Sequence, residues 1–340
     1  GGAQFLDNEV PGAQMDRLTP HMAETARRLW ILYIAASALL FLIFLALYYT
    51  GVDPLMDPFQ SIAHTFTTLP SGGFSPQGRS VEAFSAAVQW VMIPFMFVAG
   101  MNFVLLWRAL FVGPGTLFEN TEFKVYLTLF ISAGVLLGLM LGLHGQFTTA
   151  EENLRHGVFQ VATVLTSTGF ASTDFALWSG DILGILFVLM FVCGCVGSTS
   201  GGLKVLRWVV AIKVVVREMF QQIHSSSIRP LRMGERVLKE SVVRGALILI
   251  VVYLALFGVS VILIAINIHF AGIEMETIDL LSAVAATLGN VGPGLGVVGP
   301  MESFEFLPDF TKAWICLLMI AGRLEIMTFL VLLTPTYWRD

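Results

Sequence analysis

Long apolar runs separated by shorter, mixed segments dominate the pattern along the chain. About 20 consecutive apolar residues are needed for a helix to cross a hydrocarbon core about 30 Å thick. Five runs are close to that length or above it, at 29–50, 88–112, 125–143, 243–268 and 313–333, and a shorter run covers 182–196. This pattern predicts an all-α polytopic membrane protein, in agreement with 56% hydrophobic and 13% charged residues.

Three of the long runs are each followed by a shorter helix that begins on a recognisable start signal. A capping side chain before proline, a capping box, and acids in an opening turn all favour a helix N-terminus. These signals are Asp57–Pro58, Thr149 with Glu152, and Glu276 with Asp279, respectively. The chain is therefore predicted to repeat one unit three times, in which a short helix and then a second long helix follow each spanning helix.

A small, glycine-containing turn ends each short helix. Aligned on one glycine, the first turn is Ser71, Gly72 and Gly73, the second is Ser167, Thr168 and Gly169, and the third is Asn290, Val291 and Gly292. A helix of about 12 residues is about 18 Å long, so it enters the bilayer without crossing it. Irregular backbone at that depth is tolerated where it is buried in protein or lines a water-filled path. Packing alone would also satisfy this requirement, and the residues leave that alternative open.

The polarity of the short helices favours a cation at their inner ends. Each begins on the outer side, so its partly negative C-terminus points toward the membrane centre. A glycine in the following turn permits a positive φ, which lets successive carbonyls face the same way. A ring of such carbonyls can replace the hydration shell of a potassium ion. The three turns are thus predicted to form a carbonyl-lined filter.

Basic residues gather on one side of the predicted membrane. If the first span starts inside, the outer segments contain only Arg79, Arg155 and Lys312 among 19 basic residues. More than half of the 24 acidic residues lie outside, where they would raise the local concentration of cations. The positive-inside rule fixes this orientation and explains the basic segment after Lys204 without a nucleic-acid partner.

Two further features fall near the predicted path. The residues Gly197, Ser198, Thr199, Ser200, Gly201 and Gly202 interrupt the second long helix of the middle unit. They either end that helix at the membrane surface or form a loop that crosses the path, and the residues do not decide between the two. Arg323 is predicted near the middle of the last span, where an arginine usually faces a cavity or a partner. Glu325 or another acid could pair with it.

Several stretches together resemble the bacterial Trk/Ktr potassium transporter family, more closely its Trk branch. They are "GGAQFLDNEVPG", "LTPHMAETARRLW", "AGMNF" at 99–103, "GCVGSTSGGLKVLR" at 194–207 and "AGRLEIMTFLVLLTPTYW" at 321–338. The three turns are also similar to the potassium-channel filter. The resemblance implies a potassium-channel-like fold of helix–pore-helix–helix units, with K+ at the nine turn residues, an intramembrane gating loop at 197–202 and Arg323 lining the pore.

The same resemblance implies the setting of the protein. We expect a multi-pass protein of the bacterial inner membrane, in contact with lipid, that carries K+ and needs no covalent cofactor. A homodimer and a cytosolic nucleotide-binding regulatory subunit are the implied partners. The family has four units, whereas this chain shows three, so the first unit is expected to be missing. Residues 1–28 are expected to form a cytoplasmic lead-in, which resembles the segment after the missing unit. The three units are expected at 29–112, 113–224 and 241–340, with a cytoplasmic linker at 225–240.

Two other functions are alternatives to potassium uptake. A sodium-conducting or cation-cotransporting relative would share the fold, although glycine at 73, 169 and 292 favours potassium. An intramembrane enzyme would need a catalytic cluster at one depth, and the sequence contains none. "GLGVVG" at 294–299 matches the dinucleotide pattern, but it follows no strand and opens no βαβ unit.

Overall fold

The computed structural model describes residues 22–224, 229–234, 236–324, 326–332 and 334–338, which form three helical units. The first consists of α2 (Met22–Tyr49), α3 (Pro58–Thr68), α4 (Ala86–Ala99) and α5 (Phe103–Phe111). The second consists of α7 (Thr121–Leu143), α8 (Ala150–Leu165), α9 (Gly180–Leu189) and α10 (Val205–Ile223), and the third of α11 (Glu240–Phe270), α12 (Thr277–Leu288), α13 (Asp309–Arg323) and α14 (Ile326–Leu332). The predicted all-α repeated architecture is confirmed.

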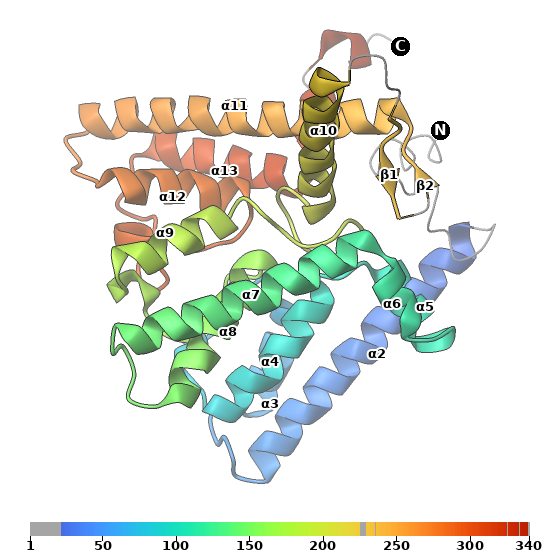
Figure 1. Cartoon of the computed structure of the whole chain (residues 1–340). Helices are drawn as coiled ribbons and strands as arrows, with labels where there is room; N and C mark the ends of the chain where they lie inside the picture. Colours follow the sequence, from blue (N-terminus) through green and yellow to red (C-terminus); the bar gives the residue numbers. More distant parts are fainter. Residues whose placement is uncertain (1–21, 225–228, 235, 325, 333, 339–340) are drawn as a thin grey trace.

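Short elements connect these helices. They are α6 (Gly115–Glu119), the 3-10 turns η2 (Ser80–Ala83), η3 (Phe175–Leu177), η4 (Gly296–Val298) and η5 (Pro335–Trp338), and the antiparallel strands β1 (Arg232–Met233) and β2 (Arg236–Val237). Most of the predicted lead-in at 1–28 lies outside the described residues. The segment 190–204 between α9 and α10, which we call the crossing loop, runs through the middle of the molecule (Figure 1).

The long helices lie on the outside and the short helices α8 and α12 lie inside, whereas α3 is buried on one face and exposes Phe59, Ile62 and Phe66 on the other. Only 22% of the apolar window of α2, 33% of that of α7 and 28% of that of α11 is buried, as expected for helices that face lipid. By contrast, α8 and α12 are buried along most of their length, including the polar side chains of Gln160, Thr163 and Ser282. Because a short helix is enclosed by protein, its polar groups can find hydrogen-bond partners at membrane depth.

Two spans predicted as continuous helices are in fact bent. The run 88–112 is divided into α4 and α5, which meet at 103°, and the run 313–333 into α13 and α14, which meet at 115°. In the first bend the side chain of Asn102 caps α5 by accepting from the Leu105 N–H, and the Gly100 carbonyl accepts from the Cys195 N–H. All three units therefore break their last long helix, whereas the sequence indicated only the break at 197–202.

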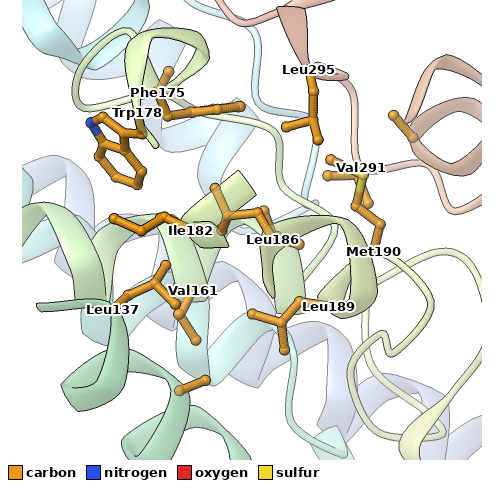
Figure 2. Packing of buried hydrophobic residues seen from close by; sticks show 14 of the residues in the cluster. Leu137, Val161, Phe175, Trp178, Ile182, Leu186, Leu189, Met190, Val291 and Leu295 are labelled. Atoms are coloured by element: carbon orange, nitrogen blue, oxygen red, sulfur yellow. The ribbon is translucent and has the colours of Figure 1, made fainter. Parts of the chain in front are cut away.

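A continuous apolar core joins the second and third units. Figure 2 shows side chains of α7, α8 and α9, including Leu137, Val161 and Leu186, packed toward Val291 and Leu295 of the third unit. Val291 belongs to the third turn, so the core holds that turn directly. The burial of Leu137, Val161 and Leu186 is complete.

Glycines let α7 and α8 approach closely. A Cβ at Gly157 of α8 would lie 2.5 Å from the Gly138 nitrogen and 2.9 Å from its Cα. Gly134 lies one turn earlier on α7 and faces Val158. Small residues at this spacing allow close backbone contact, which drives helix association where lipid removes the hydrophobic driving force.

Substitution of Gly157 by valine is expected to destabilise the protein. Overpacking typically costs about 1–3 kcal/mol, and here the obstruction is backbone that cannot rotate away. The midpoint of thermal unfolding in detergent should fall by several degrees. Gly245→Val in α11 is the matched control because a Cβ there meets nothing within 4 Å. Equal midpoints for both variants would contradict this account of the α7–α8 contact.

Candidate functional site

The predicted start signals position the three short helices, with one difference. The Asp57 carboxylate accepts from the Gln60 N–H at 2.8 Å, and Thr149 and Glu152 form a complete capping box. The Thr149 backbone N–H lowers the pKa of Glu152, which keeps this outer carboxylate charged. Glu276 makes no side-chain cap; instead, Asp279 accepts from the Val297 N–H at 3.2 Å.

The three turns share one unusual backbone conformation. In each, the residue two before the aligned glycine has a positive φ: 55° at Ser71, 50° at Ser167 and 54° at Asn290. The glycines also have positive φ, at 67° for Gly73, 93° for Gly169 and 110° for Gly292. A positive φ is uncommon in residues other than glycine, so its recurrence at one aligned position indicates a common structural requirement.

Matching hydrogen bonds close the three turns. The N–H before each aligned glycine donates to a carbonyl five residues earlier, in the pairs Gly72 to Thr67, Thr168 to Thr163, and Val291 to Ala286, at 2.9, 2.8 and 2.8 Å. In the described part of the chain, no hydrogen bond is donated to the carbonyl oxygens of residues 71–73, 167–169 or 290–292. Their lone pairs are therefore available to a cation.

The turns lie next to one another in chain order. A Cβ on Gly73 would overlap the carbonyl oxygen of Thr168, and a Cβ on Gly169 would overlap that of Val291. At Gly292 the nearest atom to an added Cβ is the Cα of Gly169, at 3.5 Å. Gly73 and Gly169 thus each pack on the middle carbonyl of the next turn, and the third turn lies at the open end of this arc.

The crossing loop passes against all three turns. Thr199 Oγ1 lies 2.8 Å from Ser71 Oγ, and the Gly201 N–H donates to Ser167 Oγ at 2.7 Å. A Cβ on Gly201 would lie 2.7 Å from Asn290 Cβ. The loop therefore contacts the same position of each turn, through the side chains of the residues with positive φ. The sequence predicted a role for their carbonyls and gave no signal for these side chains.

Arg323 does not lie mid-helix as predicted but is the last residue of α13, at the bend into α14. Leu324 ends the helix there, so the guanidinium can turn back toward the turns. Its Nη2 donates to the Pro70 carbonyl at 3.2 Å, directly before the first turn. Asn290 Nδ2 donates to the Met319 carbonyl on the same helix at 2.9 Å. The alternative partner Glu325 lies outside the described residues.

Polar side chains of the short helices support the chain after each turn. His64 Nε2 lies 3.0 Å from Ser75 Oγ, and His156 Nδ1 lies 2.8 Å from Ser172 Oγ. Ser282 Oγ accepts from the Leu295 N–H at 2.8 Å in the third unit. The structure thus gives both histidines specific partners. In all three units, a polar side chain of the short helix therefore fixes the backbone that follows the turn.

These features together define a membrane transport protein in which re-entrant helices hold backbone carbonyls at the centre of a helical bundle. The chain belongs to the TrkH family, described as cation transport proteins, whose profile matches residues 1–141 and 145–339. It is accordingly a multi-pass inner-membrane transport protein rather than an enzyme.

Individual relatives support this assignment along the whole chain. The "Trk system potassium uptake protein TrkH" of Escherichia coli (strain K12) is 32% identical over 344 residues, covering 100% of this chain and 68% of the relative. The protein of the same name from Vibrio parahaemolyticus is 33% identical, again covering 100% and 68%. The crystal structure of the potassium transporter TrkH from Vibrio parahaemolyticus superposes with a TM-score of 0.85 at 30% identity, covering 98% of this chain and 69% of that one.

Proposed function

We propose that this chain mediates potassium uptake, with the carbonyl oxygens of the three turns as the selectivity filter. The recurrent positive-φ pattern and the nine turn carbonyls, which accept no hydrogen bond from the described residues, carry this proposal. The named potassium transporters among its relatives agree with it. Potassium is the transported ion, and the filter carbonyls substitute for its hydration shell.

The crossing loop and Arg323 would control passage. The loop contacts all three turns from the side opposite the outer loops, where an ion leaving the filter would emerge. Closure by this loop would be reversible because hydrogen bonds such as those to Ser71, Ala99 and Ser167 can break and re-form, and glycine at 197, 201 and 202 provides hinges. Arg323 adds a positive charge beside Pro70 at the base of the first turn.

The partners implied by resemblance remain predictions. A fourth turn would close the arc that ends at Gly292, and the four units of the family account for it. A homodimer and a cytosolic nucleotide-binding subunit belong to the same expectation. Sodium conduction is the alternative function, and an experiment must distinguish it from potassium uptake.

Uptake of rubidium and sodium into liposomes by the complete protein tests the proposal. We expect rubidium, a potassium mimic, to enter much faster than sodium. Empty liposomes and liposomes with heat-inactivated protein measure leakage. Equal rates for the two ions would contradict the potassium filter, and preference for sodium would establish the alternative.

Arg323→Gln is expected to raise rubidium uptake about twentyfold. Two unit charges roughly 10 Å apart at an effective dielectric of about 20 repel by about 1.7 kcal/mol, and glutamine removes this barrier. Arg323→Lys retains the charge and should retain the slow rate. Lys312→Gln, near the outer end of the same helix, is a charge-matched control. Slower uptake by folded Arg323→Gln protein would show that the arginine is not a barrier.

A further inference from the structure

A basic cavity lies on the cytoplasmic side of the protein, away from the three turns. Its volume is about 490 Å³, and Lys213, Arg217, Arg229 and Arg232 line it together with apolar side chains such as Ile212 and Val216. The positive-inside distribution of charge places this part of the chain in the cytoplasmic half. The ion path proposed above does not use the cavity.

Helix α10, which forms one wall, lies at the inner membrane surface. Val210 and Val214 pack with Val243 and Ala246, which belong to the first two turns of the spanning helix α11. Figure 1 shows α10 crosswise to α11 near the β1–β2 hairpin. An amphipathic helix in this orientation lies along the interface rather than across the bilayer.

The same helix exposes a second apolar face. Its exposed residues are Ile212 at 62%, Val215 at 58%, Val216 at 53%, Met219 at 64% and Ile223 at 78%. Their spacing places them in one stripe, since residues three and four apart are neighbours on a helix. The stripe begins at the cavity, because Ile212 and Val216 belong to both.

The cations of the cavity are only partly neutralised. Arg217 pairs with Glu240 at 3.2 Å and Glu218 at 3.2 Å, and Lys213 Nζ donates to the Arg232 carbonyl at 2.7 Å. Arg229 stacks over the Phe220 ring, 4.8 Å from its centroid. Within the described residues, neither the Arg229 nor the Arg232 guanidinium donates a hydrogen bond. Both guanidinium groups are therefore available to an anion.

We propose that this cavity binds the phosphate of an anionic phospholipid from the cytoplasmic leaflet, whose acyl chain follows the apolar stripe of α10. A lipid supplies both the anion and the hydrocarbon that the adjoining surfaces need. Basic pockets on the cytoplasmic side of helix bundles recognise such headgroups. A second copy packed on the stripe would account for the exposed apolar residues but not for the incompletely neutralised cations of the cavity. Free phosphate would leave the stripe exposed.

The test compares lipid binding by the purified complete protein and two double variants. Native mass spectrometry counts bound phosphatidylglycerol and phosphatidylcholine after titration of each lipid into detergent. Each basic residue near a membrane surface strengthens anionic-lipid binding about fivefold, so Arg229→Gln with Arg232→Gln should weaken phosphatidylglycerol binding roughly thirtyfold. Lys239→Gln with Arg244→Gln removes the same charge outside the cavity and should weaken it little. Phosphatidylcholine should bind weakly to all three proteins.

Three results would overturn the site. An equal loss of phosphatidylglycerol binding in both double variants would indicate only a general effect of charge. Competition by millimolar inorganic phosphate, without dependence on the acyl chain, would replace the lipid with a soluble anion. Efficient disulfide cross-linking of Val216→Cys between two copies, in vesicles rich in phosphatidylglycerol, would show that a second copy covers the stripe. These readouts do not depend on ion transport, so they remain decisive whatever the transported ion is.

Discussion

Gly169→Ser should abolish most of the preference for rubidium over sodium. The φ of 93° at this glycine is disfavoured for serine, and the added Cβ would overlap the Val291 carbonyl oxygen. Backbone strain of this kind costs about 1–3 kcal/mol, and overlap in a packed site costs a similar amount. The chain can relieve both only by moving carbonyls of the second and third turns. Since each 1.4 kcal/mol is a factor of about ten, we expect the rubidium-to-sodium ratio to fall between tenfold and a hundredfold.

The close contacts between turns also predict an order among the three glycines. A side chain at Gly73 overlaps the Thr168 carbonyl, one at Gly169 overlaps that of Val291, and one at Gly292 comes no nearer than 3.5 Å to Gly169. Serine should therefore damage selectivity more at 73 and 169 than at 292. Gly184→Ser in α9, where nothing lies within 4 Å, is the control for expression and folding.

Initial uptake of rubidium and sodium into liposomes, at matched protein content, measures the ratio. Size-exclusion profiles establish that each variant is folded. An unchanged ratio in folded Gly169→Ser protein would show that the second turn does not contact the ion. The filter assignment would then be wrong, even if uptake itself were slower.

The repeat could be predicted from sequence because each of its parts depends on local chemistry. Capping residues such as Asp57 and Thr149 and the glycine that ends each turn are signals within a few positions. Apolar length alone located α2, α7 and α11. Each of these features is read from neighbouring residues, so long-range contacts were not needed to find them.

The bends and the contacts of the crossing loop depend instead on residues far apart in the chain. Run 88–112 is predominantly apolar, and the packing of Gly100 against Tyr126 and Thr166, together with its bond to Cys195, shows why it breaks there. Likewise, Thr199 and Ser71 are 128 positions apart. A single sequence contains no pattern that relates them. The residues that the predicted gating loop contacts could therefore not be predicted.

The fold explains why the short helices contain polar residues. Gln160, Ser172 and His156 are buried at membrane depth, where an unpaired polar group is costly. His156 Nδ1 and Gln160 Nε2 both hydrogen-bond to Ser172 Oγ, which fixes the chain after the second turn, whereas Gln160 Oε1 has no partner among the described residues. These polar residues of the short helix therefore hold the second turn in place, as the proposed filter requires.

Thr199→Val should raise potassium and rubidium flux without changing selectivity. Valine keeps the shape of threonine but removes the hydroxyl that lies 2.8 Å from Ser71 Oγ, 2.9 Å from the Leu69 carbonyl and 3.1 Å from the Ala99 carbonyl. The hydrogen bond from the Thr199 N–H to Ala99 remains. Loss of two net hydrogen bonds destabilises the closed loop by about 1–3 kcal/mol, so the open population should rise by roughly fivefold to a hundredfold while it is small.

The matched control is Thr50→Val, which removes a hydroxyl bonded to the Ala46 carbonyl at the outer end of α2. Combination with Ser71→Ala sharpens the test, because both substitutions remove the same bond and their effects on flux should be less than additive in free energy. A simultaneous fall in the rubidium-to-sodium ratio would indicate damage to the first turn instead of release of the loop. Unchanged flux in folded Thr199→Val protein would show that these bonds do not hold the path closed.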